Sequence, residues 1–293
     1  MFVGFGATGQ TGSAVADTLL EKELPVRVVL RSDKNADAWR AKGADVAFAD
    51  LTDVGGTTKA LDGAIAVYAM NPPAYHAENM FTVAKNIGAV YVEAIARSNV
   101  QKVVLLSSVG SQHASGTGNI MTTHFLENTL GGLTIPVTFL RAAYFMENWN
   151  GVAAVATEKG ILPSFLQPLE RPISIVAAKD IGRTAAEVLT EDWTGKRIIE
   201  LHGAADYSPN DVAAAFAAAL KRDVQAVALP ESEWQATIVG FGASPEAANA
   251  WCEMLRGFNS GHIIFENNGT ETRKGQTTIG DFAAETVKAQ NLT

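Results

Sequence analysis

Three glycines near the start of the chain constrain its fold more than any other feature. Gly6, Gly9 and Gly12 lie in the segment GATGQTG, which follows the apolar run Met1–Phe5 and leads into a stretch suited to a helix. This order predicts a strand, a tight turn and a helix. Glycine permits positive φ in the turn, and the missing Cβ lets a pyrophosphate approach main-chain N–H groups at the helix N-terminus. We therefore expect a dinucleotide to be cradled by Gly6, Thr8, Gly9, Gln10, Thr11 and Gly12.

A second register of the same glycine pattern starts at Gly4. It would leave only Met1–Val3 for the strand, whereas the register that starts at Gly6 leaves Met1–Phe5, which is close to the usual strand length. We therefore take Gly6 as the first glycine of the motif. The alternative is an ordinary strand-to-helix turn that binds no ligand.

The residue after the second predicted strand, Pro25–Leu30, is Arg31. In dinucleotide folds this place, about 20 residues beyond the glycines, carries the side chain that contacts the adenosine ribose. A guanidinium matches a 2′-phosphate by bidentate hydrogen bonds, whereas an acidic residue would accept from the 2′-hydroxyl of NAD. The sequence favours NADP(H), with Ser32 and Lys34 as further contacts and Asp33 as a weakening charge. The alternative is an arginine that is only a solvated surface charge.

A single cysteine, Cys252, and a net charge of -8 limit the classes of function. One thiol excludes an intrachain disulfide framework and a cysteine-rich metal site, and it fits a reducing compartment. The acidic balance disfavours nucleic acid and anionic membranes as partners, because both would repel the chain at long range. The sequence shows neither a signal-peptide pattern nor an apolar run long enough to span a bilayer. We expect a cytoplasmic protein with a small-molecule substrate, and the oligomeric state is not indicated.

Apolar, β-branched runs alternate with helical stretches through the first half of the chain. Beyond the first two, the expected strands are 45–49, 64–69, 102–106 and 137–140. This alternation predicts βαβ units and an α/β fold with a doubly wound parallel sheet of the Rossmann type. After Trp149 the pattern becomes irregular and mostly helical. We expect a dinucleotide-binding domain over residues 1–149. Residues 150–293 should form a smaller, interleaved part that covers the substrate and returns some segments to the sheet.

Small or polar residues follow the predicted strands, and the carboxyl ends of parallel strands gather at one edge of a sheet. They are Asp50 and Leu51 near the adenine, Asn71 and Pro72 beside the cofactor, and Ser107 and Ser108 after the fifth strand. Asp50 has an alternative role as a helix cap, and the serines have one as turn caps. One serine hydroxyl should face the cleft and the other the sheet packing, and the sequence does not say which.

Five segments together resemble the NmrA-like group of atypical short-chain dehydrogenases/reductases. They are 6–12, the strand end VVLR at 28–31, LLSSVG at 105–110, TFLR with YFMEN within 138–148, and AKDIG at 178–182. The resemblance extends over nearly the whole chain. It implies a Rossmann fold that binds NAD(P)H. It also implies either a quinone or dye reductase, or a non-catalytic redox sensor that binds a dinucleotide and a regulatory protein.

The chain departs from the catalytic pattern of that superfamily at one helix. In the pattern, a serine after the fifth strand acts with a Tyr-x-x-x-Lys pair, but here Ile120 stands at the tyrosine place and His124 at the lysine place. Ile120 cannot transfer a proton. His124 is therefore the candidate that hydrogen-bonds the nicotinamide ribose or acts as the acid near neutral pH, beside Ser107 and Ser108. The alternative is a surface histidine that pairs with Glu127.

Aromatic residues follow the sixth predicted strand. Tyr144, Phe145, Asn148 and Trp149 form the expected substrate site, because aromatic walls suit a flat, conjugated acceptor that stacks on nicotinamide. Tyr144 is also a candidate catalytic group. The alternative is an aromatic core cluster. Further candidates for closing the pocket from the second half are Trp251, Phe258, Asn259 and His262.

The sequence thus predicts an NADPH-dependent reductase that transfers hydride to a quinone-like or other conjugated small molecule. Such acceptors become weakly basic oxyanions, so the loss of a tyrosine acid matters less than it would for a simple ketone. The alternative is a regulatory protein that senses NAD(P) without chemistry and needs no proton donor. The sequence shows no H-E-x-x-H, paired-cysteine or carboxylate-rich spacing, so no metal is expected.

Overall fold

Six strands in the first half of the chain follow the predicted apolar runs. The computed structural model describes residues 1–292 and places these strands at β1 (Phe2–Phe5), β2 (Val26–Leu30), β3 (Asp45–Phe48), β4 (Ala66–Ala69), β5 (Lys102–Ser108) and β6 (Val137–Ala142). They join β10 (Lys196–His202) and β13 (Glu271–Lys274) in one sheet. Every pairing in this sheet is parallel. The predicted doubly wound parallel fold is confirmed.

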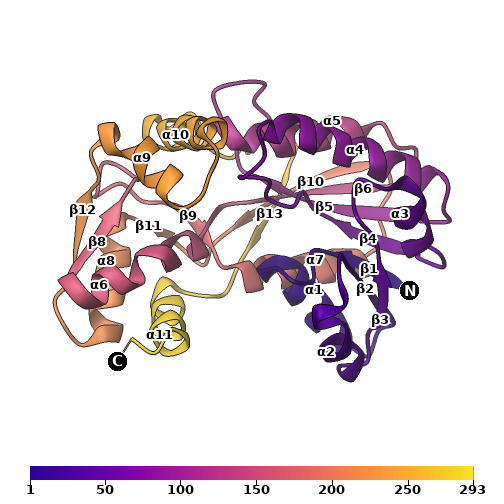
Figure 1. The fold of residues 1–293 in the computed structure, drawn as a ribbon, viewed down its shortest axis with the longest axis horizontal. Coiled ribbons are helices and arrows are strands. Elements are labelled where there is room, and N and C mark those ends of the chain that lie inside the picture. Colours follow the sequence, from indigo (N-terminus) through magenta and orange to yellow (C-terminus); the bar gives the residue numbers. More distant parts are fainter. Residues whose placement is uncertain (293) are drawn as a thin grey trace.

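The strand order creates a crevice beside β1. The order is β13-β10-β6-β5-β4-β1-β2-β3, so the chain runs outward from β1 first toward β3 and then, from β4 onward, in the opposite direction (Figure 1). At such a switch point the loops that leave neighbouring strands diverge, and ligands bind in the gap at the carboxyl ends of the strands. The glycine turn follows β1 directly and therefore lies at this point.

Alternating side chains along the strands divide the core into two layers. Phe2 of β1 packs in one buried cluster with Val15 of α1 (Gln10–Glu21) and Ile181 of α7 (Ala178–Thr190). Val3, the next residue, packs in a second cluster. The helices of that second face are α3 (Val54–Ala60), α4 (Met80–Ala96) and α5 (Met121–Gly131). Both faces of the sheet are therefore covered, as all-parallel sheets require.

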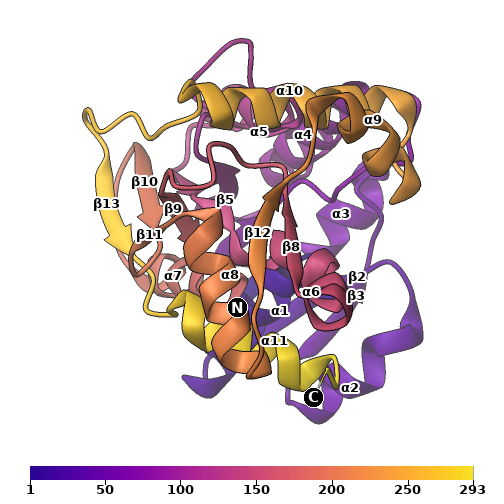
Figure 2. The same cartoon turned by 90° about the vertical axis from the view of Figure 1, so that its left-hand side faces the viewer.

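The remaining elements form a second body of structure beside the sheet (Figure 2). Its strands make two small sheets: β7 (Tyr144–Phe145), β9 (Ile173–Val176) and β11 (Asp206–Tyr207), and separately β8 (Ile161–Ser164) with β12 (Gln225–Ala228). Its helices are α6 (Ala153–Lys159), α8 (Pro209–Leu220), α9 (Glu231–Gly240), α10 (Pro245–Ser260) and α11 (Ile279–Ala289). Short helices complete the chain at α2 (Ala36–Ala41), η1 (Asp33–Asn35), η2 (Gly118–Ile120) and η3 (Met146–Val152).

Local capping chemistry fixes where the helices of this second body begin. Ser208 accepts a hydrogen bond from the Asp211 N–H at 3.2 Å, and the Asp211 carboxylate binds back to Ser208, which is a capping box with Pro209 in the first turn. Ser244 caps α10 by accepting from the N–H of Ala247 at 3.2 Å, without a reciprocal bond, and Pro245 again lies in the first turn.

The second half of the chain also contributes to the sheet. β10, β13 and α7 all come from beyond residue 150, and α7 packs on α1. The two helices pack so closely at Gly182 of α7 that an added Cβ there would lie 2.3 Å from the Cβ of Ala14 in α1. Within residues 1–292, no helix has the length and apolar character needed to cross a membrane.

Candidate functional site

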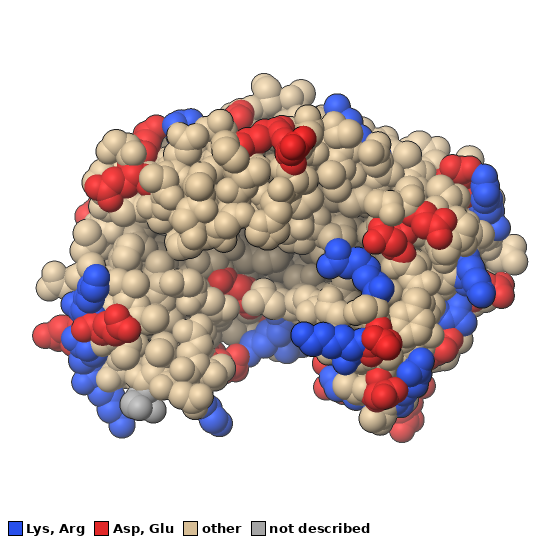
Figure 3. Space-filling view, in the orientation of Figure 1, with Lys and Arg blue, Asp and Glu red and all other residues tan. Residues whose placement is uncertain are grey.

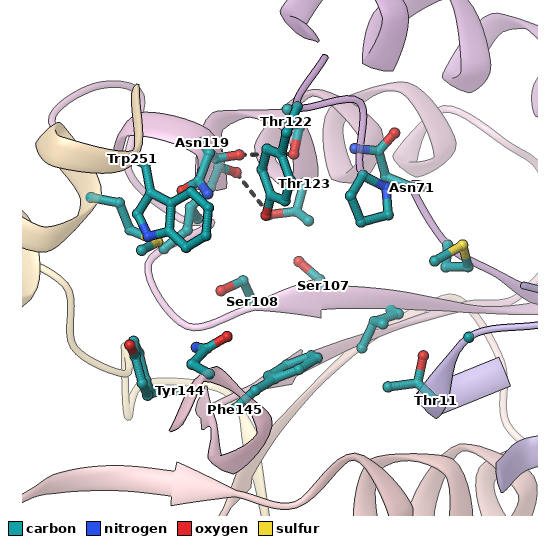
Figure 4. Close-up of a pocket in the computed structure, with 18 of the residues that line it drawn as sticks. Thr11, Asn71, Ser107, Ser108, Asn119, Thr122, Thr123, Tyr144, Phe145 and Trp251 are labelled. Atoms are coloured by element: carbon teal, nitrogen blue, oxygen red, sulfur yellow. Dashed lines mark hydrogen bonds between the residues drawn. The ribbon is translucent and has the colours of Figure 1, made fainter. Parts of the chain in front are cut away.

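A cavity of about 450 Å³ lies at the carboxyl ends of the central strands. Figure 3 shows the molecule hollowed at its centre, and Figure 4 shows the side chains that surround the space. The glycine turn lines one end, through Gly6, Gly9, Gln10 and Thr11. Aromatic residues of β7 and α10 line the other end, and the residues after β4 and β5 lie between them. One continuous space therefore connects the predicted cofactor turn with the second body of structure.

The glycine turn has the geometry of a phosphate cradle. Gly6 has a φ of +73°, which side chains rarely adopt, and a Cβ on Gly12 would lie 2.4 Å from the carbonyl carbon of Gly6. Only glycine fits at both places. Gly9 is the N-cap of α1 and supplies no side-chain hydrogen bond, so the N–H groups of the first turn stay available to a ligand. The residues present thus fit a dinucleotide pyrophosphate.

Two buried tyrosines form hydrogen bonds to residues that line the cavity. The Tyr68 hydroxyl of β4 donates to Thr11 Oγ1 at 3.0 Å, and the Tyr91 hydroxyl of α4 donates to the carbonyl of Met70 at 3.0 Å. Burial raises the pKa of both hydroxyls, so both remain neutral donors. These bonds connect the first turn of α1 and the end of β4 to the core.

The residues predicted near the adenosine are not among those that line the cavity. Arg31, at the end of β2, and Lys34, in η1, are exposed, and Leu51 is half-buried. Among residues 1–292 no carboxylate lies within ion-pair distance of the Arg31 guanidinium. Thr8 is exposed and does not line the cavity.

Asp50 closes a turn and does not cap the following helix. Its Oδ1 accepts from the N–H of Thr52 at 2.9 Å and from the Thr52 hydroxyl at 2.8 Å. These bonds and, to a lesser extent, the charge of Arg31 hold the pKa of Asp50 below its ordinary value. The cap of α3 is Asp53, which accepts from the N–H groups of Gly55 and Gly56.

Asn71, after β4, lines the cavity, and its buried Oδ1 has no hydrogen-bond partner within residues 1–292. A buried acceptor without a partner is costly, so this oxygen fits a donor supplied by a ligand. Pro72 does not line the cavity, whereas the next residue, Pro73, does. The predicted segment therefore lies at the cavity, but Pro73 and not Pro72 is the proline that lines it.

The structure separates the roles of the two serines at the end of β5. The Ser107 hydroxyl is buried and donates to Glu127 Oε1 at 2.6 Å, with Ser111 Oγ 3.0 Å away. The Ser108 hydroxyl makes only a local bond, at 3.0 Å, to the carbonyl of Val109. Both side chains line the cavity, but only the Ser108 proton is free to turn toward a ligand.

His124 is not at the cavity wall, contrary to the sequence expectation. Its Nδ1 donates to the carbonyl of Ser111 at 2.7 Å, and its Nε2 accepts from the Asn128 amide at 2.9 Å. Both ring nitrogens are engaged by protein groups, and His124 is not among the residues that line the cavity. The alternative pairing with Glu127 is not found either, because Glu127 binds Arg141. Ile120, at the place of the usual tyrosine, does line the cavity.

Three of the four candidates for the substrate site lie at the cavity. Tyr144, Phe145 and Asn148 line the cavity. Trp149 does not, because its side chain is packed in the core with only 4% of its surface exposed. Burial raises the pKa of Tyr144, so its hydroxyl stays protonated and can donate a hydrogen bond.

Two of the four pocket-closing candidates from the second half reach the cavity. Trp251 stacks on Tyr75 with ring centroids 5.2 Å apart, and Phe258 contacts Tyr144 edge to face, also at 5.2 Å. Asn259 and His262 are not among the lining residues. Asn259 instead binds the backbone of Gln167 and Phe165, and His262 lies against His113.

Four polar or aromatic residues of the site were not predicted. They are Tyr75, in the loop between β4 and α4, and Asn119, Thr122 and Thr123, around the start of α5. Asn119 Oδ1 is buried without a partner within residues 1–292. Asn119, Thr122 and Thr123 do not follow a strand end, and Tyr75 lies several residues beyond the end of β4, so the rule that indicated the serines did not indicate them. The sequence contains one indication that the start of α5 lies at the site: Ile120 stands at the tyrosine place of the catalytic pattern.

Comparisons with known proteins agree with this geometry. The NmrA-like family model matches residues 2–273. The chain is 27% identical over 257 residues to the NAD(P)H azoreductase of Xenophilus azovorans, which covers 87% of this chain and 86% of that protein. It is 24% identical over 296 residues to quinone oxidoreductase 2 of Escherichia coli (strain K12), which covers 98% of each.

A solved structure supports the fold assignment. The NADPH complex of an NADPH-dependent quinone oxidoreductase from Escherichia coli has a TM-score of 0.79 and 22% sequence identity, and covers 97% of this chain and 99% of that one. At this identity the likeness concerns the fold. Because the family model covers nearly the whole chain, and the sheet and glycine turn agree with it, the protein is a member of the NmrA-like family.

Proposed function

We propose that this protein is an NADPH-dependent reductase that transfers hydride to a quinone-like or other conjugated small molecule. One observation carries the proposal: a single cavity extends from the phosphate cradle to an aromatic wall. Gly9 and Thr11 line its cofactor end, and Tyr144, Phe145 and Trp251 line its far end (Figure 4). Relatives named as an NAD(P)H azoreductase and a quinone oxidoreductase support a reductase that acts on conjugated acceptors.

Arg31 supports NADPH over NADH as the proposed cofactor. It follows β2, the strand beside the glycine turn, and no carboxylate within residues 1–292 occupies its guanidinium. A free guanidinium at this place can bind a 2′-phosphate with two hydrogen bonds. Lys34 lies three residues further and would add positive charge.

When bound, NADPH supplies the hydride, and the chain supplies binding, orientation and hydrogen bonds. The glycine turn would hold the pyrophosphate, and Asn71 Oδ1 would accept from the cofactor. The faces of Phe145 and Trp251 would hold a flat acceptor parallel to the nicotinamide. Such positioning is a large part of what a protein contributes to hydride transfer.

Ser108 is the proposed donor to the oxygen of the acceptor. Its hydroxyl is bonded only locally, whereas the Ser107 proton is held by the Glu127 carboxylate. As the acceptor oxygen gains negative charge, a hydroxyl donor would stabilise it, with the neutral Tyr144 hydroxyl as a second candidate. The resulting phenolate-like oxygen is weakly basic, so water can provide its proton. This route needs neither the missing tyrosine acid nor His124.

A non-catalytic NAD(P)-sensing regulatory protein is the second candidate. Ile120 favours it, because an isoleucine lines the cavity where the wider superfamily has its proton donor. A sensor would retain the phosphate cradle and need no donor. It would also need a partner surface, which the cavity geometry does not specify.

Purified protein, NADPH and a panel of quinones and azo dyes will distinguish the two functions. The reductase proposal expects loss of the nicotinamide absorbance with quinones and little with aliphatic ketones. NADPH binding should be measured by calorimetry on the same preparation. Binding without oxidation by any acceptor above the background rate would reject the reductase in favour of the sensor.

A further inference from the structure

The wall of the cavity carries no formal charge. It is built from apolar, hydroxyl, amide and aromatic side chains, and no Asp, Glu, Lys, Arg or His is among the lining residues from the described part of the chain. A bound cofactor would add the negative charge of its phosphates at the glycine turn. Nothing in the wall offsets the charge of an anionic substrate.

Behind the lining residue Ser107 lies a cluster of charged side chains that are paired with one another. Arg141 points two nitrogens at Glu127, at 2.9 and 2.8 Å, and a third at Glu266, at 2.7 Å. One guanidinium thus serves two carboxylates, which leaves this cluster with an excess of negative charge. Ser107 separates Glu127 from the cavity. The cluster therefore offers no free cation to a ligand and opposes the entry of an anion.

The polar groups of the substrate end match neutral carbonyl compounds. The Ser108 hydroxyl is free to donate to a carbonyl oxygen, and Asn119 Oδ1, which is buried without a partner within residues 1–292, can accept from a hydroxyl or amide N–H of a ligand. Amides and hydroxyls pair with carbonyl and hydroxyl oxygens at little desolvation cost. A sulfonate or carboxylate needs a counter-charge when it leaves water.

We infer that this site selects electrically neutral aromatic acceptors and discriminates against anionic ones, such as sulfonated or carboxylated quinones and azo dyes. The inference rests on the proposed reductase function and deepens it by naming the charge class of the substrate. Size and aromaticity alone would admit both classes, since a sulfonate on a distal ring need not change how the reacting ring stacks. The uncharged wall makes the difference.

The test compares two naphthoquinones that differ in charge and little else. They are 1,4-naphthoquinone-6-sulfonate and the corresponding neutral 6-sulfonamide, both with an electron-withdrawing sulfonyl group. We expect kcat/KM with NADPH to be at least about tenfold higher for the sulfonamide, mainly through KM. Titration of each compound into the NADPH-loaded protein should give the same order of affinity. Equal or reversed kcat/KM values would overturn the inference.

A pair of substitutions at Asn148 tests the role of charge at the cavity. Its side chain is exposed at the cavity wall, so Asn148→Arg places a cation at the mouth, and Asn148→Gln is the uncharged control. The preference for the neutral compound should shrink several-fold in Asn148→Arg and persist in Asn148→Gln. A preference unchanged by Asn148→Arg would show that charge at the cavity does not set the selectivity. If neither quinone oxidises NADPH, the proposed reductase function fails, and the affinities of the two compounds still decide the charge inference.

Discussion

Arg141 holds both carboxylate oxygens of Glu127, at 2.9 and 2.8 Å, with at most 8% of either side chain exposed. Arg141 belongs to β6 and Glu127 to α5, so the pair joins the sheet to the helix beside the cavity. Because Glu127 also accepts the Ser107 proton, the same pair sets which way that hydroxyl points. A stabilising contact and the hydrogen-bond pattern of the site thus depend on one carboxylate.

Removal of one partner of this pair should destabilise the protein strongly. Glu127→Leu leaves a buried guanidinium with only Glu266, and a loss of about 3–5 kcal/mol in the free energy of unfolding is expected. Urea denaturation measures it. The double variant with Arg141→Met should lose less than the sum of the two single losses, because it leaves no buried charge at this place. Strictly additive losses would contradict the buried pair.

Arg31→Ala should weaken NADPH binding roughly ten- to a hundredfold and leave NADH binding nearly unchanged, because only NADPH has the 2′-phosphate. Calorimetric titration of both cofactors measures the difference. Lys34→Ala is the control for a general loss of positive charge and should cost less. Equal affinity of the wild-type protein for NADPH and NADH would remove the assignment of Arg31.

Two glycine substitutions should separate cofactor binding from folding. Gly9 has a φ of -102°, and its added Cβ would lie 3.4 Å from the nearest atom, the carbonyl oxygen of Gly6, so Gly9→Val should fold. Its side chain would obstruct the pyrophosphate, and NADPH binding should be lost. Gly12→Ala forces a Cβ to within 2.4 Å of the Gly6 backbone and should lower the melting temperature as well. Full NADPH affinity in a folded Gly9→Val protein would show that the glycine register is wrong.

The serine pair and His124 give a test of the proposed hydrogen-bond donor. Ser108→Ala should lower kcat for quinone reduction by about ten- to a hundredfold if its hydroxyl stabilises the developing oxyanion. His124→Ala should change kcat much less, since both ring nitrogens bond to protein groups and the side chain does not line the cavity. Steady-state kinetics at saturating NADPH measure both. A larger loss in His124→Ala than in Ser108→Ala would reverse these assignments.

The sequence predicted the sheet well because local signals determine it. The second strand, expected over Pro25–Leu30, lies at Val26–Leu30, and the glycine turn lies where the strand-to-helix change indicated. β13 was missed because its residues, Glu271–Lys274, are polar, and its strand conformation comes from pairing with β10 at the sheet edge. A polar edge strand carries no apolar pattern to detect.

The candidate site was less predictable because it is assembled from distant segments. Sequence order gave the strand-end residues Asn71, Ser107 and Ser108, which all line the cavity. It could not show that Tyr75 and Trp251 stack across the cavity, since only the packing of α10 over the loop after β4 brings them together. For His124, the superfamily spacing gives a place on α5 but does not give the hydrogen bonds that engage both ring nitrogens.

Glu147 should make the stability of the protein depend on pH in an unusual direction. Burial, and secondarily the nearby charge of Asp180, raise the pKa of this carboxyl above its ordinary value of 4.5, against the opposing hydrogen bond from the Ala178 N–H at 2.9 Å. The folded protein therefore holds the proton more tightly than the unfolded chain. The contribution of Glu147 to stability is then largest below about pH 4.5 and is lost as the pH rises through the raised value.

Glu147→Gln removes this titration and keeps an oxygen to accept from Ala178. The melting temperature of the variant relative to wild type should therefore increase as the pH rises from 4 to 8, because the wild-type protein must then bury a charged carboxylate whose Oε2 has no partner within residues 1–292. Thermal melts of both proteins across this range measure the difference. Glu158→Gln is the control for removal of a carboxylate, since the Glu158 side chain is exposed on α6. A difference for Glu147→Gln that is constant, or that falls with pH, would contradict the buried, proton-retaining carboxyl.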